Sequence, residues 1–406
     1  MRFEHLFALT MTLLISPPGK AQLSDPLKPI YEKNQVFRLR DAVLDSNASA
    51  FYKGAVNASF NRVRAAETEL RSVIRHSPNS DEAYEAHDLL GNMYFRNGMY
   101  REGHAEIVAA LQARPNAADP RSMLSIFTAL NALPRMMTVK VEPSVIPIER
   151  GTISLPLKAN GHDLKFFFDT GAGISVIGES EAKELGIITK PVEGTMGDAS
   201  GQGVSGLQLA MVEDLRIGGL HLRNVPFLVI ADSGEPWIHA PKTEHGIIGL
   251  PVLLAMHTLR WRPTGSFEFD FTPQPFKANE CNMLFHNSNP VIDVSVADKH
   301  LDFTLDTGAV DTDLNPQFAK SLPDIMKNGV PEKRSLEGLG GKVENASISL
   351  PSVTFKLGGK DVVLKPAHVF TEQGNGTWAS GNLGMDLLKQ AQSFTLDFSA
   401  MELRLQ

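Results

Sequence analysis

The segments Phe166-Phe167-Phe168-Asp169-Thr170-Gly171-Ala172 and Phe303-Thr304-Leu305-Asp306-Thr307-Gly308-Ala309 end in the same four residues, Asp-Thr-Gly-Ala. Before each aspartate, apolar residues occupy every second position, as one buried face of a β-strand requires. A two-residue turn comes before each strand, Asn160-Gly161 in the first case and Ala297-Asp298 in the second. Each aspartate is therefore predicted to follow the second strand of a β-hairpin.

The similarity between the two segments continues downstream. Gly246-Ile247-Ile248-Gly249 is matched by Gly381-Asn382-Leu383-Gly384, at nearly the same distance after its aspartate. A strand-like closing segment follows each glycine block, residues 267–271 in the first copy and 394–398 in the second. An isolated Asp-Thr-Gly is explained equally well as a turn that ends a strand, but a simple turn does not account for repeated flanks. The pattern predicts an internal duplication.

Two aspartates brought together by such a duplication suit the hydrolysis of a peptide bond by water. The reaction requires a base that removes a proton from water and an acid that protonates the carbonyl oxygen. Two carboxyl groups at hydrogen-bond distance share one proton, because both cannot ionise readily, and the pair then supplies both functions. The predicted catalytic residues are Asp169 and Asp306, and the residues predicted to support their turns are Thr170, Gly171, Thr307 and Gly308.

With these motifs the sequence resembles the aspartic peptidases, with two lobes of the retropepsin type in one chain. The resemblance covers residues 145–406 and is carried by the alanine at the fourth position of both motifs, by the run Ala309-Val310-Asp311-Thr312-Asp313-Leu314 and by the late glycine blocks. It implies a mainly β, bilobal fold, in which two β-barrels are related by pseudo-two-fold symmetry and two threonines bind each other across the lobes. It also implies an endopeptidase that cleaves polypeptides without a metal or another cofactor.

The sequence departs from the pepsin-like members of this family at the flap, the hairpin that closes over the substrate. Pepsin-like enzymes carry a tyrosine there, but all five tyrosines of this chain precede the first motif. The candidate flaps are therefore glycine-rich segments downstream of each aspartate, although ordinary polar loops are an alternative. The candidate flap residues are Gly197, Gly201 and Gly203 in the first lobe and Gly338, Gly340 and Gly341 in the second.

A second departure concerns the pH dependence of the predicted reaction. Ala172 and Ala309 stand where pepsins usually have a hydroxyl residue. The hydroxyl would donate a hydrogen bond to the ionised carboxylate and so lower its pKa. Without it, we expect a mildly acidic pH optimum.

Residues 1–21 combine an early arginine with a short apolar stretch, as in a secretory signal peptide. The stretch is too short to span a membrane comfortably. We therefore expect export to the periplasm or the extracellular space, with no stable membrane span after cleavage; an uncleaved anchor is the alternative. The single cysteine, Cys281, excludes an intramolecular disulfide.

Residues 47–135 are rich in alanine, and their apolar residues are spaced by three and four, as in helices. The segment resembles a tetratricopeptide repeat, with Gly103 at a position usually occupied by alanine. Two repeats are fewer than such stacks need, so a capping helix is expected over 120–133, and the repeats are a candidate binding site for a protein partner. The residues that carry the resemblance are Leu90, Gly91, Tyr94, Gly98, Tyr100, Ile107, Ala110 and Pro115, with a fainter copy at Gly54, Ala66, Leu70 and Pro78.

These predictions define six parts of the 406-residue chain, and the 42% hydrophobic content suffices for a large core. The net charge of −7 does not favour nucleic-acid binding, and the twelve histidines show no paired metal-ligand spacing. The alternative function is a non-catalytic scaffold that binds an extended peptide in the cleft. The expected parts are a signal peptide (1–21), a linker (22–46), the small all-α helical-repeat domain (47–135), the first lobe (145–275), an inter-lobe linker (276–287) and the second lobe (288–406).

Overall fold

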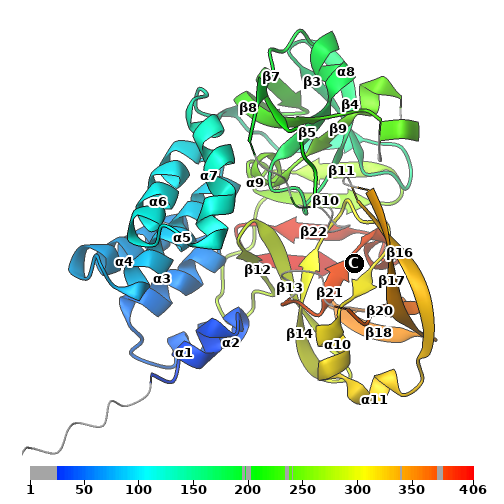
Figure 1. Cartoon of the computed structure of the whole chain (residues 1–406). Coiled ribbons are helices and arrows are strands. Elements are labelled where there is room, and N and C mark those ends of the chain that lie inside the picture. The colour runs from blue at the N-terminus through cyan, green and yellow to red at the C-terminus, as the bar shows by residue number, and fades with distance from the viewer. Residues whose placement is uncertain are drawn as a thin grey trace, which may run out of the picture.

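The computed structural model describes residues 25–193, 197, 203–233, 237–239, 241–338, 341–372 and 378–406. A helical region lies beside two β-rich regions, which are stacked one above the other in Figure 1. Among the described residues, no helix is both long enough and apolar enough to cross a bilayer. The helices of the first region are α1 (Lys28–Glu32), α2 (Val36–Leu44), α3 (Ala50–Ser59), α4 (Val63–His76), α5 (Asp81–Arg96), α6 (Tyr100–Ala113) and α7 (Ala118–Asn131).

One close contact recurs in successive helix pairs of this region. A Cβ atom added to Gly54 of α3 would lie 2.5 Å from Leu70 Cδ2 of α4, and one added to Gly91 of α5 would lie 2.9 Å from Ile107 Cδ1 of α6. The glycines therefore let each pair of helices approach closely. Helix α7 occupies the place expected for a capping helix, and the tetratricopeptide character of the two pairs remains a prediction.

The structure explains Gly103, the residue that departs from the repeat pattern. A Cβ atom at this position of α6 would collide with the ring of Phe127 on α7. Phe127 is fully buried and belongs to a core that continues into the first β-rich region through Ile174 and Trp237. The glycine is therefore required by the helix that packs on the last repeat.

Part of the segment predicted as an N-terminal linker, 22–46, is ordered helix. Phe37 and Leu39 of α2 are buried, and the guanidinium group of Arg40 donates a hydrogen bond to the carbonyl oxygen of Cys281. The prediction of a linker here was wrong because α2 is too short for its three-to-four spacing to stand out. Its Arg40 is bonded to a residue that lies 241 positions further along the chain.

The first β-rich region contains an eight-stranded sheet in the order β1-β8-β5-β9-β4-β3-β7-β6. Strand β8 also pairs with β7, so the strands from β8 to β7 form a closed ring of pairings, as in a barrel. The strands are β1 (Met137–Lys140), β3 (Ser154–Ala159), β4 (His162–Phe168), β5 (Ser175–Gly178), β6 (Lys190–Pro191), β7 (Gln208–Ile217), β8 (Leu220–Ile230) and β9 (Gly246–Ile248).

The second β-rich region contains a ten-stranded sheet in the order β16-β17-β20-β15-β21-β14-β13-β18-β19, with β12 paired to β13. The strands are β12 (Met283–His286), β13 (Asn289–Val296), β14 (Lys299–Leu305), β15 (Asp313–Leu314), β16 (Val330–Gly338), β17 (Gly341–Leu350), β18 (Val353–Leu357), β19 (Lys360–Leu364), β20 (Ala367–Phe370) and β21 (Gly381–Leu383). The short helices around the sheets are α8 (Glu179–Glu184), η1 (Trp237–His239), η2 (Lys242–Glu244), α9 (Leu250–Leu254), α10 (Pro316–Ser321), α11 (Pro323–Met326) and α12 (Met385–Leu388).

Strand β12 corrects the predicted inter-lobe linker, 276–287. It pairs with β13 over four residues, and Met283, Leu284 and Phe285 are all buried. The end of the predicted linker is therefore an integral strand of the second sheet. Sequence reasoning missed it because the strand is only four residues long.

The same pairings occur in both β-rich regions around the Asp-Thr-Gly turns. Strand β4 runs parallel to β9, with Phe168 opposite Ile248, and β14 runs parallel to β21, with Leu305 opposite Leu383. β5 and β15 then pair antiparallel with β9 and β21. Each aspartate therefore leaves its sheet beside the strand formed by the glycine block.

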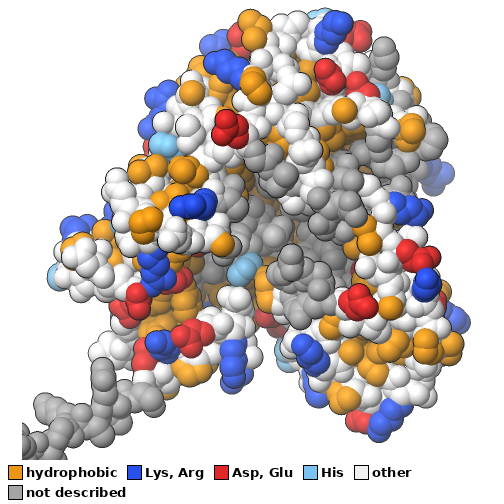
Figure 2. Space-filling view, in the orientation of Figure 1, with side chains coloured by type: hydrophobic (Ala, Val, Ile, Leu, Met, Phe, Trp, Pro, Cys, Tyr) orange, Lys and Arg blue, Asp and Glu red, His pale blue; other side chains and the backbone are white. Residues whose placement is uncertain are grey.

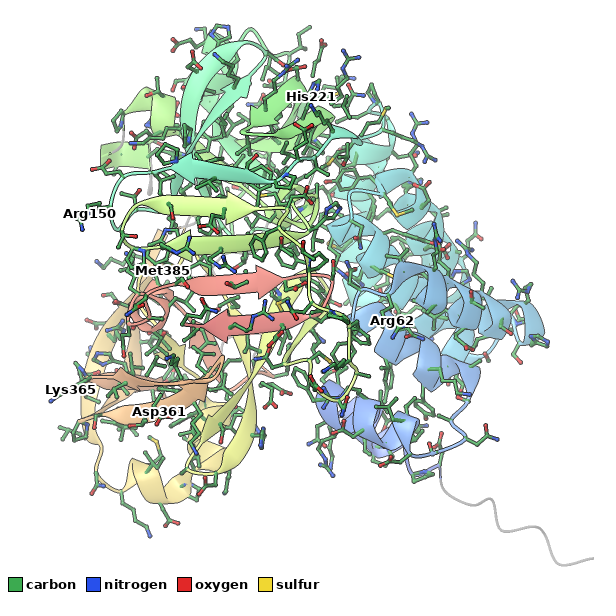
Figure 3. The ribbon with its side chains drawn as sticks, turned by 180° about the vertical axis from the view of Figure 1, so that it is seen from behind. Arg62, Arg150, His221, Asp361, Lys365 and Met385 are labelled. Atoms are coloured by element: carbon green, nitrogen blue, oxygen red, sulfur yellow. The ribbon has the colours of Figure 1, made fainter. Side chains whose placement is uncertain are left out.

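A third, five-stranded sheet joins the two β-rich regions. Its order is β2-β11-β10-β22-β23, and the pairing of β10 with β22 connects the two halves of the chain, as Figure 3 shows from behind. Trp261 and Phe394, opposite each other in this pair, are fully buried and stacked. The strands are β2 (Ser144–Pro147), β10 (Thr258–Arg262), β11 (Ser266–Phe269), β22 (Phe394–Asp397) and β23 (Glu402–Leu405).

This sheet corrects the match between the closing segments 267–271 and 394–398. β11 is the second strand after α9, whereas β22 is the first strand after α12, so the counterpart of β22 is β10. Both strands of each hairpin alternate apolar and polar residues. A pattern with period two cannot distinguish the first strand of a hairpin from the second.

We expect Gly103→Ala to reduce the free energy of unfolding by about 1 to 3 kcal/mol, because the added methyl group overpacks the core against Phe127. At a solvent-exposed helical position the same change would be stabilising. Urea denaturation measures the effect. The double variant Gly103→Ala/Phe127→Leu should lose less than the sum of its two single changes, and a Gly103→Ala protein as stable as the wild type would contradict the packing argument.

Candidate active site

Asp169 and Asp306 are held by equivalent backbone hydrogen bonds. The N–H of Asp169 donates to the carbonyl oxygen of Ile248 at 2.9 Å, and the N–H of Asp306 donates to that of Leu383 at 3.0 Å. Each aspartate thus begins its turn while still attached to the neighbouring parallel strand. The buried strands β4 and β14 fix the positions from which the two side chains project.

Four hydrogen bonds made by Thr170 and Thr307 connect the two turns. The N–H of each threonine donates to the hydroxyl group of the other, at 3.0 Å for Thr170 and 3.1 Å for Thr307. Each hydroxyl group then donates across to the opposite strand end, Thr170 to the Leu305 carbonyl at 2.9 Å and Thr307 to the Phe168 carbonyl at 3.1 Å. Both threonines are fully buried, so these bonds satisfy groups that water does not reach.

The two glycines of the motifs let the carboxyl groups approach each other. A Cβ atom on Gly308 would lie 2.5 Å from Asp169 Oδ2, and one on Gly171 would lie 2.8 Å from Asp306 Cγ. Any larger residue would therefore displace the opposite aspartate. With this space available, the carboxyl groups of Asp169 and Asp306 lie close enough for the charge of Asp306 to raise the pKa of Asp169.

Burial raises the pKa of Asp169 well above its ordinary value, and the charge of Asp306 and the hydrogen bond between the two carboxyl groups raise it further. The N–H groups of Gly171 and Gly308 act in the opposite direction, because they favour the ionised form. The balance favours a protonated Asp169 at a pH where an ordinary aspartate is ionised. Such a pair can donate one proton and accept another.

The two carboxyl groups differ in their other hydrogen bonds. Asp306 Oδ1 accepts from the N–H groups of Gly308 at 2.9 Å and Ala309 at 3.0 Å, and its Oδ2 accepts from Asn382 Nδ2 at 3.1 Å. Asp169 Oδ1 accepts from the N–H of Gly171 at 2.7 Å. Sequence reasoning missed Asn382, although it is the polar residue at the position that Ile247 occupies in the first glycine block.

Ser175 and Thr312 are a further matched pair that sequence reasoning missed. The N–H of Gly249, at the end of the first glycine block, donates to Ser175 Oγ at 3.0 Å, and the N–H of Gly384 donates to Thr312 Oγ1 at 2.9 Å. Both hydroxyl residues lie six positions after their aspartate. They tie the loop that follows each aspartate to the strand beside it.

The described part of the second candidate flap is a β-hairpin. Strands β16 and β17 pair along their whole length, and Gly338 lies opposite Gly341 in the last pair, where Gly341 has a φ of 130°. Gly340 lies outside the described residues, as does Gly201 in the first candidate flap. Gly197 and Gly203 are described but belong to no strand. Flap function therefore stays a prediction.

Arg334 attaches the β16–β17 hairpin to the loop that follows the second aspartate. Its guanidinium group lies 2.9 Å from Asp311 Oδ2 and 3.2 Å from Asp313 Oδ1. Burial raises the pKa of Asp313, while Arg334 acts to lower it. This ion pair fixes the middle of strand β16 relative to the motif.

The helical region contacts the loop that follows Asp169. A Cβ atom on Gly173 would lie 3.3 Å from Ser288 Cβ and 3.5 Å from the ring of Phe95 in α5. The neighbouring residue Arg96 is buried and donates hydrogen bonds to the carbonyl oxygens of Asn287, at 2.9 Å, and Ala58. The helices therefore pack beside the candidate site rather than being tethered at a distance.

Over the described part of the face seen in Figure 2, acidic and basic side chains are interspersed. Among the described residues, no group of three or more His, Cys, Asp or Glu side chains is arranged to hold a metal ion. The predictions of no metal and no nucleic-acid partner are not tested by this observation.

Comparison with known proteins finds a matching family model and a similar solved structure. Residues 155–252, which include Asp169 and the first glycine block, match the family model described as aspartyl protease. A retropepsin-like aspartic protease from Rickettsia conorii, known from its crystal structure, is 16% identical, with a TM-score of 0.25; the match covers 33% of this chain and 93% of that one. No curated protein matches the chain.

We expect Thr170→Val to destabilise the protein by about 2 to 6 kcal/mol, because it leaves the Leu305 carbonyl and the Thr307 N–H buried without partners, each at a cost of about 1 to 3 kcal/mol. Valine has nearly the shape of threonine, so packing changes little. Denaturant unfolding measures the loss. Thr170→Ser, which keeps the hydroxyl group, is the matched control, and an equal loss in both variants would show that the hydrogen bonds are not responsible.

Proposed function

We propose that this chain is an aspartic endopeptidase in which Asp169 and Asp306 activate one water molecule. The observation that carries the proposal is the placement of two carboxyl groups on matching turns, each packed against the glycine of the other. At this separation the charge of Asp306 raises the pKa of Asp169. The family match over residues 155–252 supports it independently. A structural role alone does not require two matched acids at this distance.

In the proposed mechanism the ionised carboxylate removes a proton from water as the water attacks the scissile carbonyl carbon. The protonated carboxyl group donates its proton to the carbonyl oxygen, and a tetrahedral intermediate forms. This intermediate then collapses as the leaving amine receives a proton. No metal or organic cofactor takes part in any of these steps.

The arrangement of the substrate follows from the two β-rich regions. We propose that they are two lobes of the same fold, related by a pseudo-two-fold axis that passes between the aspartates, and that the polypeptide substrate lies across this axis. The paired backbone and threonine hydrogen bonds support this arrangement. The β16–β17 hairpin is the proposed flap of the second lobe, and the glycine-rich segment around 197–203 is the proposed flap of the first.

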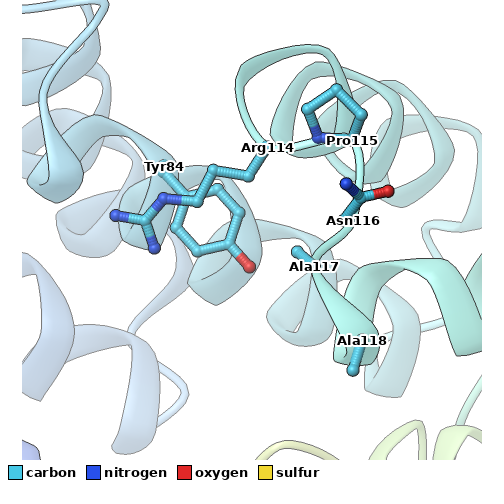
Figure 4. A pocket seen from close by; sticks show the side chains of 6 residues that line it. All are labelled: Tyr84, Arg114, Pro115, Asn116, Ala117 and Ala118. Carbon is cyan, nitrogen blue, oxygen red and sulfur yellow. The ribbon is translucent and has the colours of Figure 1, made fainter.

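The helical region is a candidate binding site for a protein partner, through repeats of the tetratricopeptide type. Beside these helices lies a hollow of about 520 Å³ lined by Tyr84 and Arg114, with the guanidinium group 3.9 Å from the centre of the tyrosine ring (Figure 4). Phe95, Phe127 and Trp237 belong to one core that joins these helices to the first lobe. Deleting the region would therefore expose this core, so point variants of the hollow are the appropriate test of partner binding.

The scaffold function remains the second candidate, since a cleft that holds an extended peptide need not cleave it. Cleavage of a peptide library separates the two functions. We expect Asp169→Asn and Asp306→Asn each to reduce kcat/KM by about 10²- to 10⁴-fold, because each removes one of the two proton-transfer groups.

The rate of the wild-type enzyme should follow a bell-shaped pH profile with a mildly acidic optimum. At lower pH both carboxyl groups are protonated and at higher pH both are ionised, and neither form can perform both transfers. Equal turnover by the wild type and both variants would refute the dyad, as would an optimum above pH 8.

We also propose that the chain is exported, on the basis of residues 1–21, which lie outside the described residues. We expect the mature protein to lack these residues and to be found in the periplasm or the medium. Cell fractionation followed by N-terminal sequencing tests this, and a protein that starts at Met1 in the membrane fraction would indicate the uncleaved anchor instead.

A further inference from the structure

The glycine blocks place different side chains at equivalent positions beside the two aspartates. In β9, Ile247 lies opposite Phe167 of β4, whereas in β21, Asn382 lies opposite Thr304 of β14. Both positions are two residues before the last glycine of their block and adjoin the strand end from which an aspartate projects. The first site is thus apolar where the second carries a primary amide.

The amide of Asn382 is oriented by a chain of two hydrogen bonds. Its Oδ1 accepts from the hydroxyl group of Thr304 at 2.6 Å, and its Nδ2 donates to Asp306 Oδ2 at 3.1 Å. These lengths are typical of O–H···O and N–H···O hydrogen bonds respectively, which favours this orientation of the amide over the reversed one. A reversed amide would present its oxygen to Oδ2 and would require a proton on Asp306.

We propose that Asn382 is a positioning residue that keeps Asp306 ionised and so leaves the shared proton of the dyad on Asp169. This inference rests on the proposed function, because it assigns the two roles within the same pair. Asp306 accepts from three N–H groups, those of Gly308, Ala309 and Asn382, and donors of this kind stabilise a carboxylate. Asp306 is then the base that removes the proton from water, and Asp169 is the acid.

The surroundings of Asp169 complement this assignment. Its burial and the charge of Asp306 raise its pKa, and the N–H groups of Gly171 and Gly308 offset this only in part. Ile247, at the position equivalent to Asn382, offers it no donor and is itself buried. A neutral carboxyl group that donates to its ionised neighbour is the state that such a site favours.

Other titratable groups lie on the elements packed around the dyad, and most of them are paired. Lys165 of β4 is 3.2 Å from Glu244, and Asp313 of β15 is paired with Arg334 of β16. Asp302 lies on β14, four residues before Asp306, and burial raises its pKa to about 7, with the charge of Asp293 as a second cause. The ionisation of Asp302 must therefore be distinguished from those of Asp169 and Asp306 in any titration of the protein.

The test is a direct titration of the carboxyl groups by NMR, with ¹³C-labelled aspartate in the full-length protein. The variants Asp169→Asn and Asp306→Asn assign the carboxyl signals of Asp169 and Asp306, and Asp302→Asn assigns the carboxyl signal of Asp302. In the wild type we expect Asp306 to ionise first. The pair ionises in two steps, the lower one at the lower pH and the upper one at the higher pH. In Asn382→Ile, which places the residue of the first glycine block in the second, the midpoint of the lower step should rise by about one pH unit, while that of the upper step stays unchanged.

The direction of these shifts follows from the state that Asn382 stabilises. Its donor favours both the singly and the doubly ionised dyad over the fully protonated one, so removing it affects the lower step only. Thr304→Val, which releases the amide oxygen, should shift the same step in the same direction by a smaller amount. Ile247→Val is the matched control in the first block and should shift neither step.

Three results would overturn the inference: ionisation of Asp169 before Asp306, a shift confined to the upper step in Asn382→Ile, or no shift in that variant. Circular dichroism of each variant verifies that the fold is retained, and Thr304→Val provides a second reading if Asn382→Ile does not fold. The titration does not depend on turnover. A wild type that titrates as expected but cleaves no peptide would contradict the proposed function and leave the assignment of the charge intact.

Discussion

The reciprocal hydrogen bonds between Thr170 and Thr307 are the constraint on which the rest of the site depends. Each threonine uses its N–H and its hydroxyl group to bind the opposite turn, so neither turn can move without breaking bonds in the other. All the groups involved are buried, where an unpaired donor or acceptor is costly. The distance between the two carboxyl groups is therefore set by the backbone of both halves, and glycine is the residue that fits beside each of them.

The surrounding structure supports this arrangement from three sides. The five-stranded sheet joins the halves through β10 and β22, and Ser175 and Thr312 tie the loops after the aspartates to the glycine blocks. The helical region adds contacts through Phe95 and Arg96 at the edge of the first loop. These contacts favour a rigid pair of aspartates, as the proposed reaction with one shared water molecule requires.

Much of the fold and the centre of the site could be predicted from local patterns. The alternation of apolar residues before each aspartate predicted strands that now appear as β4 and β14, and spacings of three and four predicted the helices of the first region. Short elements were missed: α2 and β12 lay in expected linkers, because four to nine residues carry too little pattern to distinguish an element from a loop. β11 was matched with β22 because two strands of one hairpin have the same period.

The sequence by itself predicted the duplication, the two aspartates and the residues of their turns, because these features repeat along the chain. Only the tertiary structure decided what differs between the copies. The need for glycine at 103 comes from Phe127 on another helix, and the donor to Asp306 comes from Asn382, 76 residues further along the chain. A repeated pattern reveals what the two halves share. The proposed location of the shared proton on Asp169 depends instead on contacts between residues that are distant in sequence and that differ between the halves.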